Sequence, residues 1–229
     1  MATVLRPLVW VLVAAIIAAA VPAHAQSISE QQALVDRARA TAESMINDPG
    51  VAPLKDWLKR AKGVIIVPSF LKAGFVLGGA GGSAVVLTRD AGGTWSAPAF
   101  YTVSEASFGL QIGVQDAEII FAVMTDKGMS SIIRNQIKLG VDASMAVGPV
   151  GAGVQGNTTT AAGADIYAFA RTGGVYGGAT IQGGWLKPRQ SWNVAYYSEG
   201  ATSEAILVQH RFTNSGADGL RTSLAQLVR

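Results

Sequence analysis

Glycine placed inside short apolar runs is the feature that most restricts the fold of this chain. Of its 229 residues 27 are glycine, most of them after residue 63, where apolar residues come in runs of strand length. Such glycines cost backbone entropy and indicate bulges, sharp curvature or close approach of two backbones. The pattern predicts a strongly curved, mainly antiparallel, glycine-rich β-sheet or partial barrel. The expected strands are 64–67, 74–79, 83–88, 99–103, 108–114, 118–124, 164–170 and 175–182, with a hairpin turn at 90–93.

Helical periodicity flanks this strand region and interrupts it once. Residues 27–48 carry apolar side chains at three-to-four spacing, and Ser29 with Gln32 forms a capping-box pattern. A shorter helix is expected over 53–62, ended by Gly63 in the C′ position. Further helices are expected over 126–136, 203–210 and 220–227. Because no linker or fixed-period repeat divides the chain, we expect one α+β domain with N-terminal, central and C-terminal helices packed around the sheet.

The first 25 residues have the layout of a secretory signal peptide. Arg6 precedes an apolar run over 8–21, and the small-residue tripeptide 23–25 follows. The run holds 14 residues, fewer than the roughly 20 that a membrane-spanning helix needs, which favours cleavage after Ala25. We expect a signal peptide over 1–25, a single folded domain over 26–229, and export to the periplasm, the outer-membrane periphery or the medium.

The composition excludes several kinds of chemistry. The chain has no cysteine, so disulfides, thiolate metal sites, cysteine nucleophiles and a lipid-modified cysteine are ruled out. Removing the signal segment takes one of 18 basic residues and none of the 15 acidic ones. The remainder is nearly neutral and has no global field to attract nucleic acid. With only His24 and His210 available, a serine triad or a histidine-based zinc site is not expected.

Two further patterns bear on catalysis and cofactors. Residues 151–156 match the dinucleotide-binding fingerprint, but a polar run follows where a helix N-terminus is required, so no cofactor is expected. The carboxylates of Glu105, Asp116, Glu118 and Asp126 fit no calcium loop and are interpreted as solvated turn residues. A hydrolase built on such carboxylates stays an alternative, because folding assembles acid pairs that spacing does not reveal. We expect a protein that is not an enzyme.

The second predicted helix carries the strongest binding signal. It combines cations with large apolar side chains, the composition that lets a helix lie among lipid head groups while lysine and arginine meet phosphates. The cations are Lys55, Lys59, Arg60 and Lys62, and the apolar residues are Leu54, Trp57 and Leu58. In the alternative, the apolar residues cap the β core and the cations only face water. Each cation near an anionic bilayer contributes about 1 kcal/mol, so the expected binding is weak and salt-sensitive.

Several ordered motifs make the chain resemble one known family. They are Ala61-Lys62-Gly63-Val64 with Pro68, Lys72-Ala73-Gly74-Phe75 with Gly78-Gly79, Trp95-Ser96-Ala97-Pro98-Ala99-Phe100, Ser107-Phe108-Gly109 with Gln111 and Gly113, and Gly148-Pro149-Val150-Gly151. From about residue 34 to about residue 208 the chain resembles the SYLF-domain family, also described as a lipid-binding or yeast actin-binding domain family. The resemblance implies membrane association through phospholipid head groups, phosphoinositides in eukaryotic members, and actin-filament binding in some of those.

The resemblance also directs attention to the N-terminal helical part as the membrane contact. The expected lipid-binding residues are Lys55, Trp57, Lys59, Arg60, Lys62 and the motif residue Lys72. A bacterial type of signal peptide would place the protein away from actin, so the expected partner is an anionic phospholipid membrane surface and actin is not expected. No SH3 or zinc-finger module is expected, so avidity would come from homo-oligomerisation. The expected function is a phospholipid-binding peripheral membrane domain; the alternative is a cell-envelope scaffold that binds protein or glycan partners.

Overall fold

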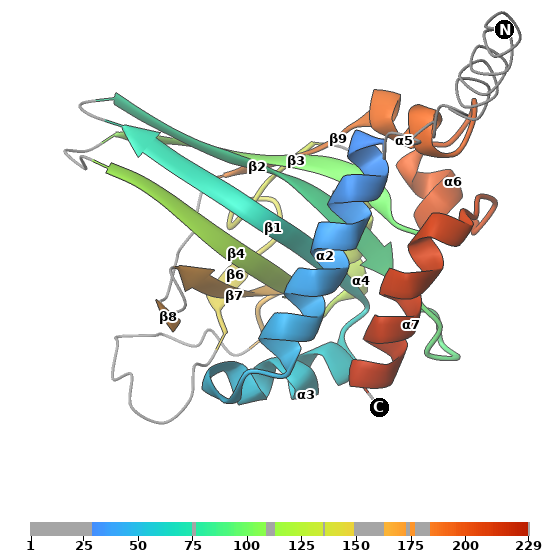
Figure 1. Ribbon diagram of the computed structural model, residues 1–229, viewed down its shortest axis with the longest axis horizontal. Helices are drawn as coiled ribbons and strands as arrows, with labels where there is room; N and C mark the ends of the chain where they lie inside the picture. The colour runs from blue at the N-terminus through green and yellow to red at the C-terminus, as the bar shows by residue number, and fades with distance from the viewer. Residues whose placement is uncertain are drawn as a thin grey trace, which may run out of the picture.

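A curved β-sheet forms the centre of the molecule (Figure 1). The computed structural model describes residues 29–74, 77–108, 113–134, 136–148, 163–172, 175–176 and 184–228. The strands within these ranges are β1 (Gly63–Gly74), β2 (Leu77–Thr88), β3 (Ala99–Phe108), β4 (Gly113–Val123), β5 (Ile137–Lys138), β6 (Met145–Val147), β7 (Ile166–Thr172), β8 (Val175–Tyr176) and β9 (Trp185–Pro188). Their order is β5-β9-β3-β2-β1-β4-β7-β6, and β8 pairs with β7.

The sheet is antiparallel except where β6 runs parallel to β7. Its middle consists of β1 to β4, which have 10 to 12 residues each and extend past the helices at one end (Figure 1). The pairing of β1 shifts register between Ile66 and Leu71 against β2. Glycine permits this bend, since a Cβ on Gly82 would lie 2.2 Å from the Ser69 carbonyl oxygen. The predicted α+β class with a strongly curved, mainly antiparallel sheet is confirmed, and several of the predicted short strands join into longer ones.

Helices cover both faces of the sheet, because side chains along the central strands alternate between two apolar layers. Val64 and Ile66 face one layer, and Ile65 and Val67 face the other. The first layer lies under α2, α3, α5 and α7, and the second under α4 and α6. Figure 1 shows α2 and α7 side by side across the sheet, with α3 at one end of α2. The helices are α2 (Glu30–Ile46), α3 (Ala52–Arg60), α4 (Asp126–Arg134), α5 (Gln190–Tyr196), α6 (Ser203–Leu207) and α7 (Asp218–Leu227).

Helix α2 begins at the cap that the sequence predicts. The Ser29 hydroxyl accepts a hydrogen bond from the backbone N–H of Gln32 at 3.2 Å. The Gln32 side chain turns away from the cap and donates to the carbonyl oxygen of Gly216 at 2.9 Å. It also accepts a hydrogen bond from the Tyr196 hydroxyl at 2.8 Å. Gln32 therefore joins α2 to segments that lie far along the chain.

Helix α3 ends two residues earlier than predicted. Arg60 is its last residue, and Ala61 is already extended with φ −69° and ψ 143°. Gly63 starts β1, so its predicted role as the C′ residue of the helix is wrong. Glycine is needed there because a Cβ would lie 2.5 Å from Met129 Sδ and 2.8 Å from the Leu87 carbonyl oxygen. Strand pairing takes over before Gly63, since the Lys62 N–H donates to the Val123 carbonyl at 2.8 Å.

Other predicted elements are found with altered limits. Helices α4 and α7 match the predictions over 126–136 and 220–227, and α6 is shorter than 203–210. The turn at 90–93 is confirmed by the bond from the Gly93 N–H to the Asp90 carbonyl, with Gly93 at φ +84°. Helix α5 and strand β9 are not predicted by the periodicity.

Some predictions concern residues that the structure does not describe. The signal peptide over 1–25, the fingerprint at 151–156 and most of the predicted strand 175–182 lie outside the described residues. In the part of the chain that is described, no helix is both long and apolar enough to cross a membrane.

Candidate functional site

Helix α3 presents its cations outward because two leucines fix its inner side. Leu54 and Leu58, four residues apart, are fully buried in the apolar layer beneath the helix. At 100° per residue, Lys59 and Arg60 fall on the side away from these leucines. Both are exposed, whereas Lys55 is half-buried. Leu54 and Leu58 therefore cap the β core, as the alternative interpretation of the sequence has it, and they do not face a membrane. The cations form the outer surface of the helix, and their contact with lipid stays a prediction.

Trp57 lies at the edge of α3, against the sheet. Its ring is half-buried and contacts Tyr167, with ring centroids 3.9 Å apart and planes inclined by 36°. The Arg60 guanidinium carbon lies 4.9 Å from the Trp57 ring centroid, within cation–π range. Much of the apolar surface of Trp57 thus packs against other residues of the protein. Arg60, its cation–π partner, remains exposed.

Two of the predicted cations already have acidic neighbours. Lys62 Nζ lies 3.5 Å from Asp126 Oδ1, and Lys59 Nζ lies 4.0 Å from Asp56 Oδ1. All four side chains are at least two-fifths exposed, so water screens both pairs and each contributes little to stability. The lysines can exchange these partners for another anion at small cost.

Lys72 is not part of this group. It lies ten residues beyond Lys62 along an extended strand, which corresponds to roughly 30 Å. Its ammonium group is 3.4 Å from Glu105 Oε2. Lys55, Trp57, Lys59, Arg60 and Lys62 thus gather at one end of β1, and Lys72 lies near the other.

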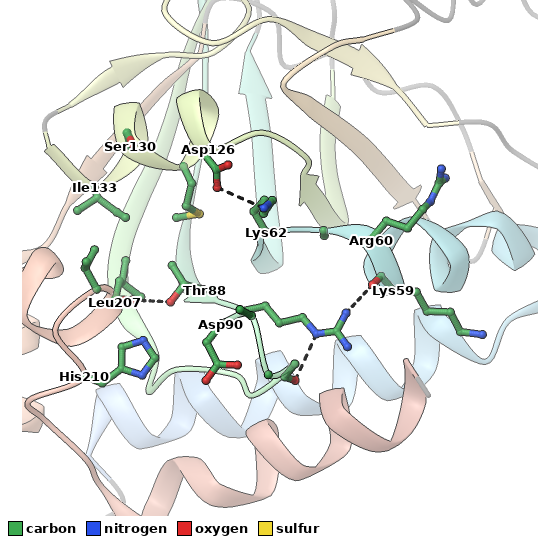
Figure 2. A pocket seen from close by; sticks show the side chains of 17 residues that line it. Lys59, Arg60, Lys62, Thr88, Asp90, Asp126, Ser130, Ile133, Leu207 and His210 are labelled. Atoms are coloured by element: carbon green, nitrogen blue, oxygen red, sulfur yellow. Dashed lines mark hydrogen bonds and ion pairs between the residues drawn. The ribbon is translucent and has the colours of Figure 1, made fainter.

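An open groove of about 760 Å³ adjoins the C-terminal end of α3 (Figure 2). It lies between that helix end, the turn after β2, helix α4 and the segment after α6. In Figure 2, Lys62 points toward Asp126 within the groove, and Lys59 and Arg60 extend away from its middle. The charged or titratable side chains that line it are Lys59, Arg60, Lys62, Arg89, Asp90, Asp126 and His210. Lysine and arginine thus outnumber carboxylates by two.

Arg89 is the basic residue of this groove that the sequence pattern does not predict. It is half-buried, and its side chain is held by backbone carbonyls: Nη1 donates to the Lys59 oxygen at 2.5 Å and Nε to the Gly93 oxygen at 3.2 Å. Among the described residues no carboxylate forms an ion pair with it. Its position directly before the predicted turn was the available signal, but an arginine at the end of a strand usually does no more than face water.

The carboxylates considered for catalysis each have a separate partner. Glu105 pairs with Lys72, and Asp126 pairs with Lys62. Asp116 accepts a hydrogen bond from the Ser69 hydroxyl at 2.8 Å. Glu118 forms a close ion pair with Arg171 and accepts a hydrogen bond from Thr41 at 2.9 Å. Strands β3 and β4, which carry Glu105 and Asp116, are separated by β2 and β1, a backbone distance of roughly 14 Å at normal strand spacing.

Within the described ranges, no metal-binding site and no histidine-based catalytic site is assembled. No group of three or more histidine or acidic side chains there could hold a metal ion. His210 is exposed at the rim of the groove and has φ +51°, an uncommon value for a residue other than glycine. The arrangement is suited to binding an anion at a surface.

Comparison with known proteins agrees with a binding domain. The sequence model of one family, described as Ysc84: Las17-binding protein actin regulator, matches residues 104–227. That is more than half of the chain, and the chain belongs to this family. The resemblance to the SYLF-domain family is thereby confirmed.

Named relatives come from fungi and vertebrates. LAS seventeen-binding protein 3 of Saccharomyces cerevisiae is 32% identical over 155 residues, which cover 66% of this chain and 34% of the relative. SH3 domain-containing YSC84-like protein 1 of Homo sapiens is 28% identical over 151 residues, covering 66% and 44%. The Xenopus laevis protein of the same name is 26% identical over 180 residues, covering 78% and 53%. The chain therefore spans only about a third to a half of the length of these relatives.

Proposed function

We propose that this protein is a peripheral phospholipid-binding domain that acts without catalysis. The observation that carries the proposal is the exposed cationic side of α3, which is held rigidly because Leu54 and Leu58 are buried beneath it. The membrane-contact residues are Lys55, Lys59, Arg60 and Lys62, with Trp57 at their edge. Lys72 belongs to a separate part of the surface.

The expected affinity is low. Four cations at about 1 kcal/mol each give about 4 kcal/mol, which corresponds to millimolar binding. The acidic neighbours of Lys59 and Lys62 reduce this further, whereas any apolar insertion adds to it. Homo-oligomerisation would raise the avidity by linking several such surfaces. Binding must also weaken as salt is added, because exposed charges are screened over about 10 Å at 0.1 M ionic strength.

Localisation forms part of the proposal. With a signal peptide over 1–25, the mature domain would act in the periplasm, at the outer-membrane periphery or outside the cell. An anionic phospholipid surface would then be its partner, and actin would not be available.

A charge-reversal experiment tests the proposal. The first variant replaces four cations by glutamate: Lys55, Lys59, Arg60 and Lys62. A matched control variant replaces four exposed cations elsewhere by glutamate: Arg37, Arg134, Lys187 and Arg211. Cosedimentation uses vesicles of phosphatidylcholine with and without phosphatidylglycerol, at rising salt. We expect the first variant to lose binding and the control to retain most of it. Equal binding by both variants would reject the α3 surface, and no binding by the unmodified protein would reject the function.

A scaffold that binds a protein partner is the second candidate. It is favoured by the names of the relatives, one of which is called a LAS seventeen-binding protein. Crosslinking in intact cells that recovers one abundant protein, together with no vesicle affinity, would favour the scaffold over the lipid-binding domain.

A further inference from the structure

We propose that the groove beside α3 binds one phosphate group, with Lys62 and Arg89 as its two cationic contacts. This inference rests on the proposed function in one respect: it takes the phosphate to be that of a lipid head group. The α3 surface alone would bind anionic lipids without selecting among head groups. The groove adds a specific site for one phosphate.

The backbone holds these two cations opposite each other. Gly63 pairs with Thr88, so Lys62 stands opposite Arg89 when the antiparallel register continues by one residue. The Arg89 N–H donates to the Lys62 carbonyl at 2.8 Å, which confirms that the two residues adjoin. Directly opposed residues have Cβ atoms about 5 Å apart. The charged ends are held by different partners, Asp126 for Lys62 and the Lys59 and Gly93 carbonyls for Arg89. A phosphate that bridges the two cations would therefore draw Lys62 away from Asp126.

The Arg89 side chain is already held in place and has donors left for such an anion. Its guanidinium group has five N–H donors, and two of them are fixed by the carbonyls of Lys59 and Gly93. For the remaining donors no acceptor is found among the described residues. A planar guanidinium held in this way suits two oxygens of one phosphate. Because carbonyls and not carboxylates fix the side chain, its positive charge is not neutralised.

Lys62 can exchange its acidic partner Asp126 for a phosphate. Its side chain is half exposed, and its acidic partner Asp126 is 85% exposed on the first turn of α4. Their 3.5 Å separation is that of a screened surface pair. A phosphate in the groove would compete with Asp126 for Lys62. Asp126 thus weakens phosphate binding, as does Asp90, whose carboxylate accepts the Thr94 N–H at the turn.

The walls of the groove fit a head group that remains attached to a lipid. Val208 is 55% exposed at the rim, and Ile133 and Met129 line the α4 side. Of these three only Val208 is well exposed, since Met129 is buried and Ile133 partly buried. A phosphate that enters between the exposed cations would leave the glycerol end of the lipid near Val208. A soluble phosphate ester would use the cations but not Val208.

Two variants with opposite expected signs test the site. Lys62→Gln removes one cation and should weaken phosphate binding by about tenfold, whereas Asp126→Asn removes the competitor and should strengthen it several-fold. Lys127→Gln is the matched control, because Lys127 is 75% exposed and pairs with Asp165 outside the groove. The probes are inorganic phosphate, glycerol 3-phosphate, and vesicles of phosphatidylcholine with phosphatidylglycerol. Amide NMR shifts at Lys62, Arg89 and Gly93 report soluble binding, and cosedimentation reports vesicle binding.

The proposal predicts saturable shifts at these three amides with glycerol 3-phosphate, and the same order of variants in the vesicle assay. If vesicles bind but Lys62→Gln and Lys127→Gln behave alike, and no shifts occur, the groove is refuted while the membrane function stands. If glycerol 3-phosphate binds with the predicted order and vesicles do not, the lipid source of the phosphate and the proposed function are both refuted.

Discussion

Replacing Trp57 by alanine separates a structural role of this ring from a role in membrane insertion. The ring is half-buried against Tyr167, with centroids 3.9 Å apart, and lies under the Arg60 guanidinium. Removing a fully buried tryptophan costs about 3–5 kcal/mol. Because Trp57 is only half-buried, we expect a loss of about 2 kcal/mol in the free energy of unfolding. For a protein of this size that corresponds to about 4–8 °C in Tm.

The assay is thermal and urea unfolding of Trp57→Ala beside vesicle cosedimentation of the same sample. Trp185→Ala is the control, since Trp185 is 41% exposed on β9 and its removal should lower the free energy of unfolding by less than the removal of Trp57. We expect Trp57→Ala to lower Tm while changing vesicle affinity by less than about threefold. An unchanged Tm with lost vesicle binding would refute this reasoning and make Trp57 an insertion residue.

Two further predictions concern the stability of the fold, one through packing and one through pH. Gly63→Ala should destabilise the fold by about 1–3 kcal/mol, because its Cβ would meet Met129 and the Leu87 carbonyl. Gly79→Ala, with nothing within 4 Å, should leave calorimetric Tm nearly unchanged, and equal Tm values for both variants would contradict the packing argument. The Thr125 hydroxyl, as the largest cause, and Ser144 lower the pKa of Asp165. Its carboxylate therefore stabilises the fold above its unfolded pKa of about 3.9, and this contribution is lost as pH falls through the lower folded pKa. In urea titrations Asp165→Asn should be less stable than the unmodified protein at neutral pH, with the difference shrinking in acid; a difference independent of pH would refute it.

Periodicity and glycine placement were sufficient to predict the class of fold. Alternating apolar runs require two covered faces, and glycine within them requires curvature, because each is a property of a few neighbouring residues. Ser29 could be recognised as a cap for the same reason. By contrast, the local sequence wrongly predicts that Gly63 ends a helix. It does not show that Met129 of α4 approaches Gly63. Strand β9 was missed because its pairing partner β3 lies far along the chain. Helix α5 was missed because its seven residues are too few to show a helical period.

The sequence by itself determined that cations gather around Trp57 on a short amphipathic helix, because helical spacing is a local property. Only the tertiary structure decided that Leu54 and Leu58 face the core, that Trp57 contacts Tyr167, and that Lys72 lies apart from the other cations. It also brought Arg89 opposite Lys62, through the pairing of β1 with β2. Register between strands follows from burial of the whole sheet, and so a binding groove built across strands cannot be read from the order of residues alone.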